Sequence, residues 1–195
     1  MTLKRYKTLD IIILTVIALL ADVIALVFTK MLLKTNYDNI YIAPSIVFIL
    51  IIYIRWGKVG FISNAVLLIG QYTLYTTQIF ESTTLAIAFS LGYLSLFLVT
   101  LWKKDKKESV ISSGVKTVLI YYFIPYGLMI LLEAGASYIL GFQGKFMVFV
   151  IRHTTNFLLG MIVIIIAKMQ KNFLVDMELY LLKQQKEKDE KKNEY

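Results

Sequence analysis

Hydrophobic residues gather along the chain in six long blocks that short polar stretches separate. Each block approaches or exceeds the ~20 apolar residues that cross the hydrocarbon core of a bilayer as a helix. The blocks cover residues 9–33, 39–54, 59–80, 83–102, 110–140 and 146–167. The fifth is long enough to tilt, to kink at Pro125 or to begin as an interfacial helix at Val110. The pattern predicts an all-α membrane bundle of six transmembrane helices.

Basic residues are concentrated in alternate connections between these blocks. They lie before the first block, between the second and third, between the fourth and fifth, and after the sixth: Lys4, Arg5, Lys7, Arg55, Lys58, Lys103, Lys104, Lys106, Lys107, Lys168 and Lys171. The other connections hold only Lys30, Lys34 and Lys145. This distribution follows the positive-inside rule. It places both termini in the cytoplasm and requires an even number of spans.

The chain changes character near residue 170, which divides it into a transmembrane domain, 1–169, and a cytoplasmic tail, 170–195. Apolar residues recur near helical spacing at the start of the tail and predict a short amphipathic helix: Phe173, Leu174, Met177, Leu181 and Leu182. After Leu182 nearly every side chain is charged or an amide, which is typical of a solvated or disordered segment. The tail could anchor at the membrane surface or contact a partner.

Composition removes several classes of chemistry. The 195 residues are 58% hydrophobic, with a mean hydropathy of +0.69 and a net charge of +8. The chain has no cysteine and one histidine, so it lacks thiolate ligands and the two or three histidines of a typical metal site. Walker and H-E-x-x-H motifs are also missing. We predict a multi-pass protein of the plasma membrane, surrounded by lipid, that is not an enzyme, needs no cofactor or metal and binds no nucleic acid.

Polar side chains inside the apolar blocks are functional candidates, because a buried ionisable group is costly in a membrane. Seven of them belong to the layer nearest the exterior: Gln71, Tyr75, Gln78, Glu133, Arg152, His153 and Asn156. The first three are spaced at i, i+4 and i+7, so they share one helix face. Glu133 and Arg152 each lie roughly 10 Å from the outer end of their block. The seven predict an outward-facing cavity for a small molecule.

Structural roles stay open for several of these residues. Glu133 and Arg152 could neutralise each other as an ion pair, and His153 could be a hydrogen-bonded packing residue. Asp22, near the middle of the first block, could be a proton or ion site. We prefer a helix-contact role for it, because no second acid lies at its depth.

The stretch from Tyr41 to Tyr75, YIAPSIVFILIIYIRWGKVGFISNAVLLIGQYTLY, resembles a known family. It is similar to the second and third helices of substrate-binding S components of energy-coupling-factor (ECF) transporters. Their pattern is a proline-bearing apolar helix, then R-[WY]-G-x-x-x-G at a tight cytoplasmic turn, then a helix with glycine. Arg55, Trp56, Gly57 and Gly60 match that turn, with a shorter glycine spacing.

The resemblance implies a function. S components have six helices and both termini inside, and they bind a vitamin-like molecule from outside in a site built from helices four to six. Glu133, Arg152, His153 and Asn156 belong to that region here. A transmembrane T subunit and a cytoplasmic pair of ATPases would then topple the protein to release its ligand inward.

The family's first helix carries an alanine stripe that contacts the T subunit. Ala21 and Ala25, with Ala18 one turn earlier, would be that stripe here, and internal packing is the alternative. Asp22 departs from the usual apolar filling between them. As for the ligand, an arginine and a histidine favour an anionic or carbonyl group, and the many aromatic residues favour a ring.

Two rival functions remain. A structural morphogenetic protein, resembling the six-helix rod-shape-determining family, shares the layout of helices two and three. That family usually carries an aspartate late in helix three, where this chain has Gln71, Tyr75 and Gln78. A membrane enzyme acting on a lipid would need a paired acid, histidine or cysteine constellation, which the sequence does not show.

Overall fold

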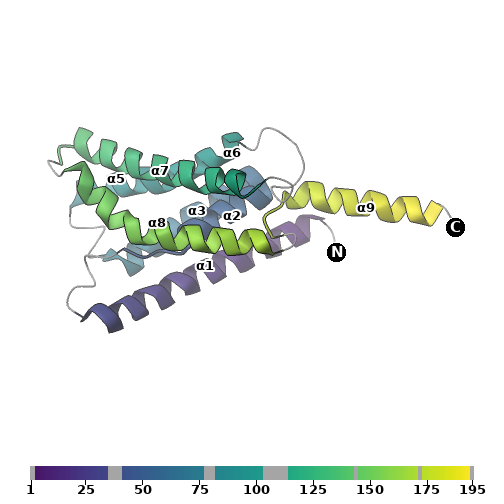
Figure 1. Cartoon of the computed structure of the whole chain (residues 1–195), viewed down its shortest axis with the longest axis horizontal. Coiled ribbons are helices and arrows are strands. Elements are labelled where there is room, and N and C mark those ends of the chain that lie inside the picture. Colours follow the sequence, from purple (N-terminus) through teal and green to yellow (C-terminus); the bar gives the residue numbers. More distant parts are fainter. Residues whose placement is uncertain are drawn as a thin grey trace.

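A computed structural model describes residues 3–34, 41–76, 82–102, 114–142, 145–170 and 173–193. Within these residues every regular element is a helix (Figure 1). They are α1 (Leu3–Leu33), α2 (Ser45–Trp56), η2 (Gly57–Val59), α3 (Gly60–Leu74), α5 (Thr83–Leu94), η3 (Ser95–Leu98), α6 (Val99–Trp102), α7 (Val115–Ile139), α8 (Phe146–Met169) and α9 (Met177–Asn193). The predicted all-α class is therefore confirmed.

Five stretches of the described chain are long and apolar enough to cross a membrane: Leu3–Leu33, Ser45–Leu74, Thr83–Leu101, Val118–Ile139 and Phe146–Met169. Their outward faces carry large aliphatic side chains. Ile24 on α1 and Ile151 on α8 are 68% and 67% exposed. A soluble protein would bury such residues, whereas lipid tails solvate them. The helices are those of a multi-pass membrane protein.

The stretch Ser45–Leu74 is folded back on itself at η2. Ser45 Oγ and Gln71 Nε2 are 2.9 Å apart, whereas a straight helix would separate these residues by ~39 Å. Gly57 allows the reversal, because its φ of 59° suits a residue without a Cβ. A Cβ on Gly60 would lie 2.7 Å from the Tyr53 ring. α2 and α3 are therefore an antiparallel hairpin, as the two separate blocks predicted.

Most helix boundaries lie close to the predicted blocks. α5, η3 and α6 together cover the predicted 83–102, and α8 extends the predicted 146–167 by two residues. α7 continues through Pro125, and Val110 lies outside the described residues. The largest differences are of six residues: α1 begins at Leu3 and not at 9, α2 begins at Ser45 and not at 39, and α3 ends at Leu74 and not at 80. The described residues before α2, 41–44, are not helical and are called here the Tyr41 segment.

α5 and α7 pack closely and bring aromatic rings into the interior. Gly92 makes the approach possible, since a Cβ there would lie 2.9 Å from both the Met129 carbonyl oxygen and Glu133 Cβ. The largest buried side chains nearby are rings: Tyr41, Phe89, Tyr93, Tyr122 and Tyr126. This contact positions Glu133 inside the bundle.

The tail is held to the same end of the bundle as the start of α1 (Figure 1). Arg55 Nε donates to Asp10 Oδ2 at 2.8 Å, and its Nη1 donates to the Phe173 carbonyl oxygen at 2.8 Å. Trp56 Nε1 also donates to Asp10 Oδ2, at 2.6 Å. Three parts of the chain therefore meet at Arg55, and we call Asp10, Arg55, Trp56 and Phe173 the Arg55 clamp.

The tail helix differs from the prediction in length. α9 begins at Met177 and extends to Asn193, well past Leu182. From Lys183 to Lys191 its side chains are exposed, as predicted for a solvated segment, but this part is helical and not disordered. Lysine, glutamate and glutamine are good helix formers, which explains the difference.

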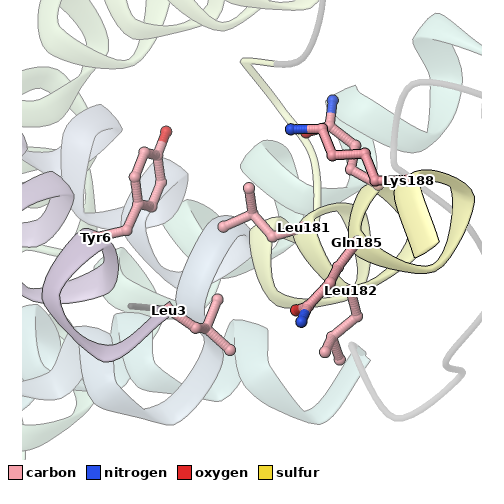
Figure 2. A pocket seen from close by; sticks show the side chains of 7 residues that line it. Leu3, Tyr6, Leu181, Leu182, Gln185 and Lys188 are labelled. Carbon is pink, nitrogen blue, oxygen red and sulfur yellow. The ribbon is translucent and has the colours of Figure 1, made fainter. Parts of the chain in front are cut away.

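A surface cavity of about 430 Å³ lies between the first turn of α1 and the second and third turns of α9 (Figure 2). It is lined by Leu3, Tyr6, Leu181, Leu182, Gln184, Gln185 and Lys188. This cavity lies at the opposite end of the bundle from the start of α8 (Figure 1).

We predict that Gly92→Ala destabilises the bundle by about 1–3 kcal/mol, because the new methyl group forces α5 away from the α7 backbone. Gly127→Ala is the matched control, since a Cβ there meets nothing within 4 Å. The control should be neutral or stabilising by up to about 1 kcal/mol. Unfolding in detergent measures both variants, and equal effects would contradict the close α5–α7 contact.

We predict that Asp10→Asn loosens the tail, because three donors of the Arg55 clamp lose a carboxylate acceptor. The expected loss is about 2–3 kcal/mol of stability, with faster amide hydrogen exchange in residues 173–182. Lys58→Gln, at an exposed position of the same turn, is the control and should change neither. Unchanged exchange in Asp10→Asn would show that the clamp does not hold the tail.

Candidate functional site

The predicted site residues face the interior of the bundle. Gln71, Glu133 and His153 are fully buried, and Tyr75 and Asn156 are 2% exposed. Arg152 is half-buried. Gln78 lies outside the described residues. The other six come together in one polar network, which has two parts.

The first part joins α7 to α8. Glu133 Oε1 accepts from Arg152 Nη1 at 3.1 Å, and Glu133 Oε2 lies 2.8 Å from His153 Nε2. His153 Nδ1 is 3.3 Å from the Tyr126 hydroxyl, to which Asn156 Nδ2 donates at 2.8 Å. Tyr126 and Glu133 are seven residues apart, two turns of helix, so both face α8. The ion pair that was left open as an alternative is thus formed.

The second part joins α1, the α2–α3 hairpin and α5. Asp22 Oδ1 accepts from the Ser45 backbone N–H at 2.9 Å, and Gln71 Nε2 donates to Asp22 Oδ2. Gln71 Oε1 accepts from the Tyr41 hydroxyl at 2.9 Å. The Ser45 and Tyr93 hydroxyls lie 3.1 Å apart. Asp22 therefore makes the helix contact that was preferred for it.

The Tyr41 segment crosses the interior between these two parts. Its backbone is not helical, so its polar groups need partners from other elements. Asn156 Oδ1 accepts from the Ala43 N–H at 3.0 Å, and the Tyr75 hydroxyl donates to the Ile42 carbonyl oxygen. Two predicted binding residues thus serve, in this structure, to satisfy backbone groups.

The ring of Tyr41 connects the two parts of the network. Arg152 Cζ lies 5.4 Å from its centroid, and 5.5 Å from that of Phe89. The His153 ring meets Tyr41 edge-on, with centroids 5.4 Å apart. Sequence reasoning did not find Tyr41, Ser45, Tyr93 or Tyr126 as site residues. Their roles depend on partners from other helices, which no spacing within one helix reveals.

One donor in the cluster is unused. Arg152 Nη2 is buried and has no hydrogen-bond partner in the described part of the chain. Buried polar atoms are nearly always hydrogen-bonded, so an exception needs an explanation. A guanidinium N–H beside two aromatic rings can bind a carboxylate or carbonyl oxygen.

The alanine stripe on α1 is directed more inward than the partner-contact prediction requires. Ala18 is fully buried, and Ala21 and Ala25 are half-buried. Asp22 is drawn into the bundle by Ser45 and Gln71, and it rotates this side of α1 toward the interior. Ala18 packs within the chain, as in the alternative of internal packing, and contact of the stripe with a partner stays a prediction.

Comparison with known proteins provides no relative for this chain. No family model matches it, and neither a curated protein nor a solved structure does. Within the described residues, no three His, Asp or Glu side chains are grouped as a metal ion would need.

We predict that Glu133→Gln destabilises the protein by about 3 kcal/mol, because it leaves Arg152 buried without a counter-charge. Arg152→Gln should be similarly harmful, whereas the double variant should lose less than the sum of the two. A double-mutant cycle measures this coupling. Lys145→Gln, at an exposed position before α8, is the control. Additive losses would show that the two residues do not act as a pair.

Proposed function

We propose that this chain is the substrate-binding subunit of an uptake system, which takes a vitamin-like small molecule from outside the plasma membrane. It would act as an S component does, energised by a separate T subunit and a cytoplasmic ATPase pair. The observation that carries the proposal is Arg152, whose buried Nη2 has no hydrogen-bond partner among the described residues and whose guanidinium lies against Tyr41 and Phe89.

The topology of the proposal is six spans with both termini in the cytoplasm. The α2–α3 hairpin supports an even number, because it makes two passes of one apolar stretch. The start of α1 and the tail lie at one end of the bundle (Figure 1), where the basic residues Arg55 and Lys168 also occur. Arg152 lies near the start of α8, at the other end. The candidate site would then face the exterior.

Ligand binding in this proposal requires the Tyr41 segment to move. Tyr41 covers Arg152 and His153, and Ala43 occupies the Asn156 amide oxygen. A ligand with a ring and an anionic or carbonyl oxygen could replace the Tyr41 ring and add a hydrogen bond that the present structure lacks. The ring would take the place of the phenol, and the oxygen would accept from Arg152 Nη2.

A structural membrane protein of the rod-shape-determining type is the second candidate. It is favoured by the fact that Glu133, Arg152 and His153 already bond to one another. In that case the network would only hold α7 and α8 together. α9, which extends from the bundle in Figure 1, would offer a surface to other proteins.

We expect the purified protein to retain a small molecule that mass spectrometry detects, or to melt higher with one member of a vitamin panel. Arg152→Gln should weaken binding by about 30-fold or more, because a charge-assisted hydrogen bond worth about 2 kcal/mol is lost. Lys145→Gln should bind like the wild type. If no vitamin raises the melting temperature, and purification recovers cell-wall synthesis proteins instead, the uptake proposal fails.

A further inference from the structure

Asp22 is the buried acid that has no cation among its described contacts. It is fully buried, and its carboxylate oxygens accept from the Ser45 N–H and the Gln71 amide. Glu133, the other buried acid of the described residues, pairs with Arg152, and the half-buried Asp10 pairs with Arg55. Asp22 thus differs from these acids in having no cationic partner among the described residues.

The position of Asp22 makes a bare charge costly. It is 11 residues before the end of α1 at Leu33, roughly 17 Å and so close to the middle of a hydrocarbon core of ~30 Å. A carboxylate at that depth disfavours insertion and folding unless it is paired or neutralised. Hydrogen bonds from neutral donors reduce this penalty but leave the net charge in place.

The elements packed around Asp22 offer only neutral groups. From the Tyr41 segment, α2, α3 and α5 these are Tyr41, Ser45, Gln71, Tyr75 and Tyr93. The Tyr75 hydroxyl donates to the Asp22 backbone carbonyl at 3.4 Å and not to the carboxylate. Arg152 lies over the Tyr41 ring but is bonded to Glu133.

We propose that Asp22 is a proton-binding site, and that the protonated carboxyl group fastens α1 to the α2–α3 hairpin. This proposal does not rest on the uptake function. A hydronium ion of the surrounding water gives up a proton, which forms an O–H bond at Oδ2 as one O–H bond of the hydronium breaks and a water molecule is left. Once neutral, the carboxyl group is both a donor and an acceptor.

The surrounding groups can accommodate this proton by exchanging partners, although the Tyr41 hydroxyl then loses Gln71 Oε1 as its acceptor and Ser45 Oγ loses Gln71 Nε2 as a donor. Rotating the Gln71 amide by half a turn brings its Oε1 to Asp22 Oδ2 and its Nε2 to the Tyr41 hydroxyl oxygen. The new O–H then donates to Gln71 Oε1. Oδ1 continues to accept from the Ser45 N–H. Loss of the proton would place a negative charge in the interface between α1 and the α2–α3 hairpin. This charge would weaken the packing of α1 against the hairpin.

Infrared spectroscopy of the wild-type protein tests the proton directly. A protonated carboxyl group has a C=O stretch that a carboxylate lacks. We expect this band at neutral pH, lost in Asp22→Asn, shifted in Asp22→Glu and retained in Glu133→Gln. Asp22→Glu also assigns the band if Asp22→Asn does not fold. Absence of the band in the wild type, or its persistence in Asp22→Asn, overturns the proposal.

Stability as a function of pH provides a second test. At a pH above the ordinary pKa of an aspartate, the unfolded chain has lost the Asp22 proton but the folded protein of this proposal still holds it. The free energy of unfolding therefore falls as the pH rises. The unfolding equilibrium constant should increase about tenfold per pH unit until Asp22 ionises. Asp22→Asn should remove this slope. Asp10→Asn is the control, because Asp10 lies in the same helix but is paired with Arg55. This variant should be less stable than the wild type and should keep the same dependence of stability on pH.

Thermal unfolding also distinguishes a bound proton at Asp22 from a bound sodium ion. Exchanging potassium for sodium at constant ionic strength should leave the melting temperature of the wild type unchanged at high pH. Stabilisation by sodium that Asp22→Asn abolishes would assign the site to sodium and overturn the proposal. Failure of all vitamin binding would leave these outcomes unaffected, because none of them requires a ligand.

Discussion

The structure depends on one constraint: a polar group inside the bilayer has no water to bond and must find its partner within the protein. The Tyr41 segment shows the result most clearly. Its Ala43 N–H and Ile42 carbonyl are bonded by Asn156 and Tyr75, side chains from α8 and the end of α3. A short piece of irregular backbone before α2 is thereby bonded to both α3 and α8.

The sequence predicted the helices because hydropathy is a local property of each span. The reversal at Gly57 was also predictable from local sequence, because arginine, tryptophan and glycine follow one another between two apolar blocks. The hydroxyl groups of Ser45, Tyr93 and Tyr126 were not predictable as site residues. Each gains its role from a partner on another helix, which helical spacing does not encode.

Two further features of the structure depend on contacts between residues that are far apart in the sequence. Ala18 lies inside the bundle, which is the internal packing that was left open for it, because Asp22 bonds to Ser45 and Gln71 on that side of α1. The charged tail was predicted to be solvated or disordered after Leu182, yet it continues as a helix to Asn193. The Arg55 clamp holds its start, and high helix propensity extends it from there.

The two parts of the network are not independent, because Tyr41 belongs to both. Its hydroxyl bonds Gln71, the partner of Asp22, and its ring lies under Arg152 and beside His153. Any movement of Tyr41 that uncovers Arg152 therefore removes a hydrogen bond from Gln71. It thereby disturbs the interface between α1 and the α2–α3 hairpin. Conversely, a change in the charge of Asp22 alters how firmly Gln71 holds Tyr41. A ligand at Arg152 and a proton at Asp22 would then influence each other through a single side chain, and that influence is necessarily reciprocal.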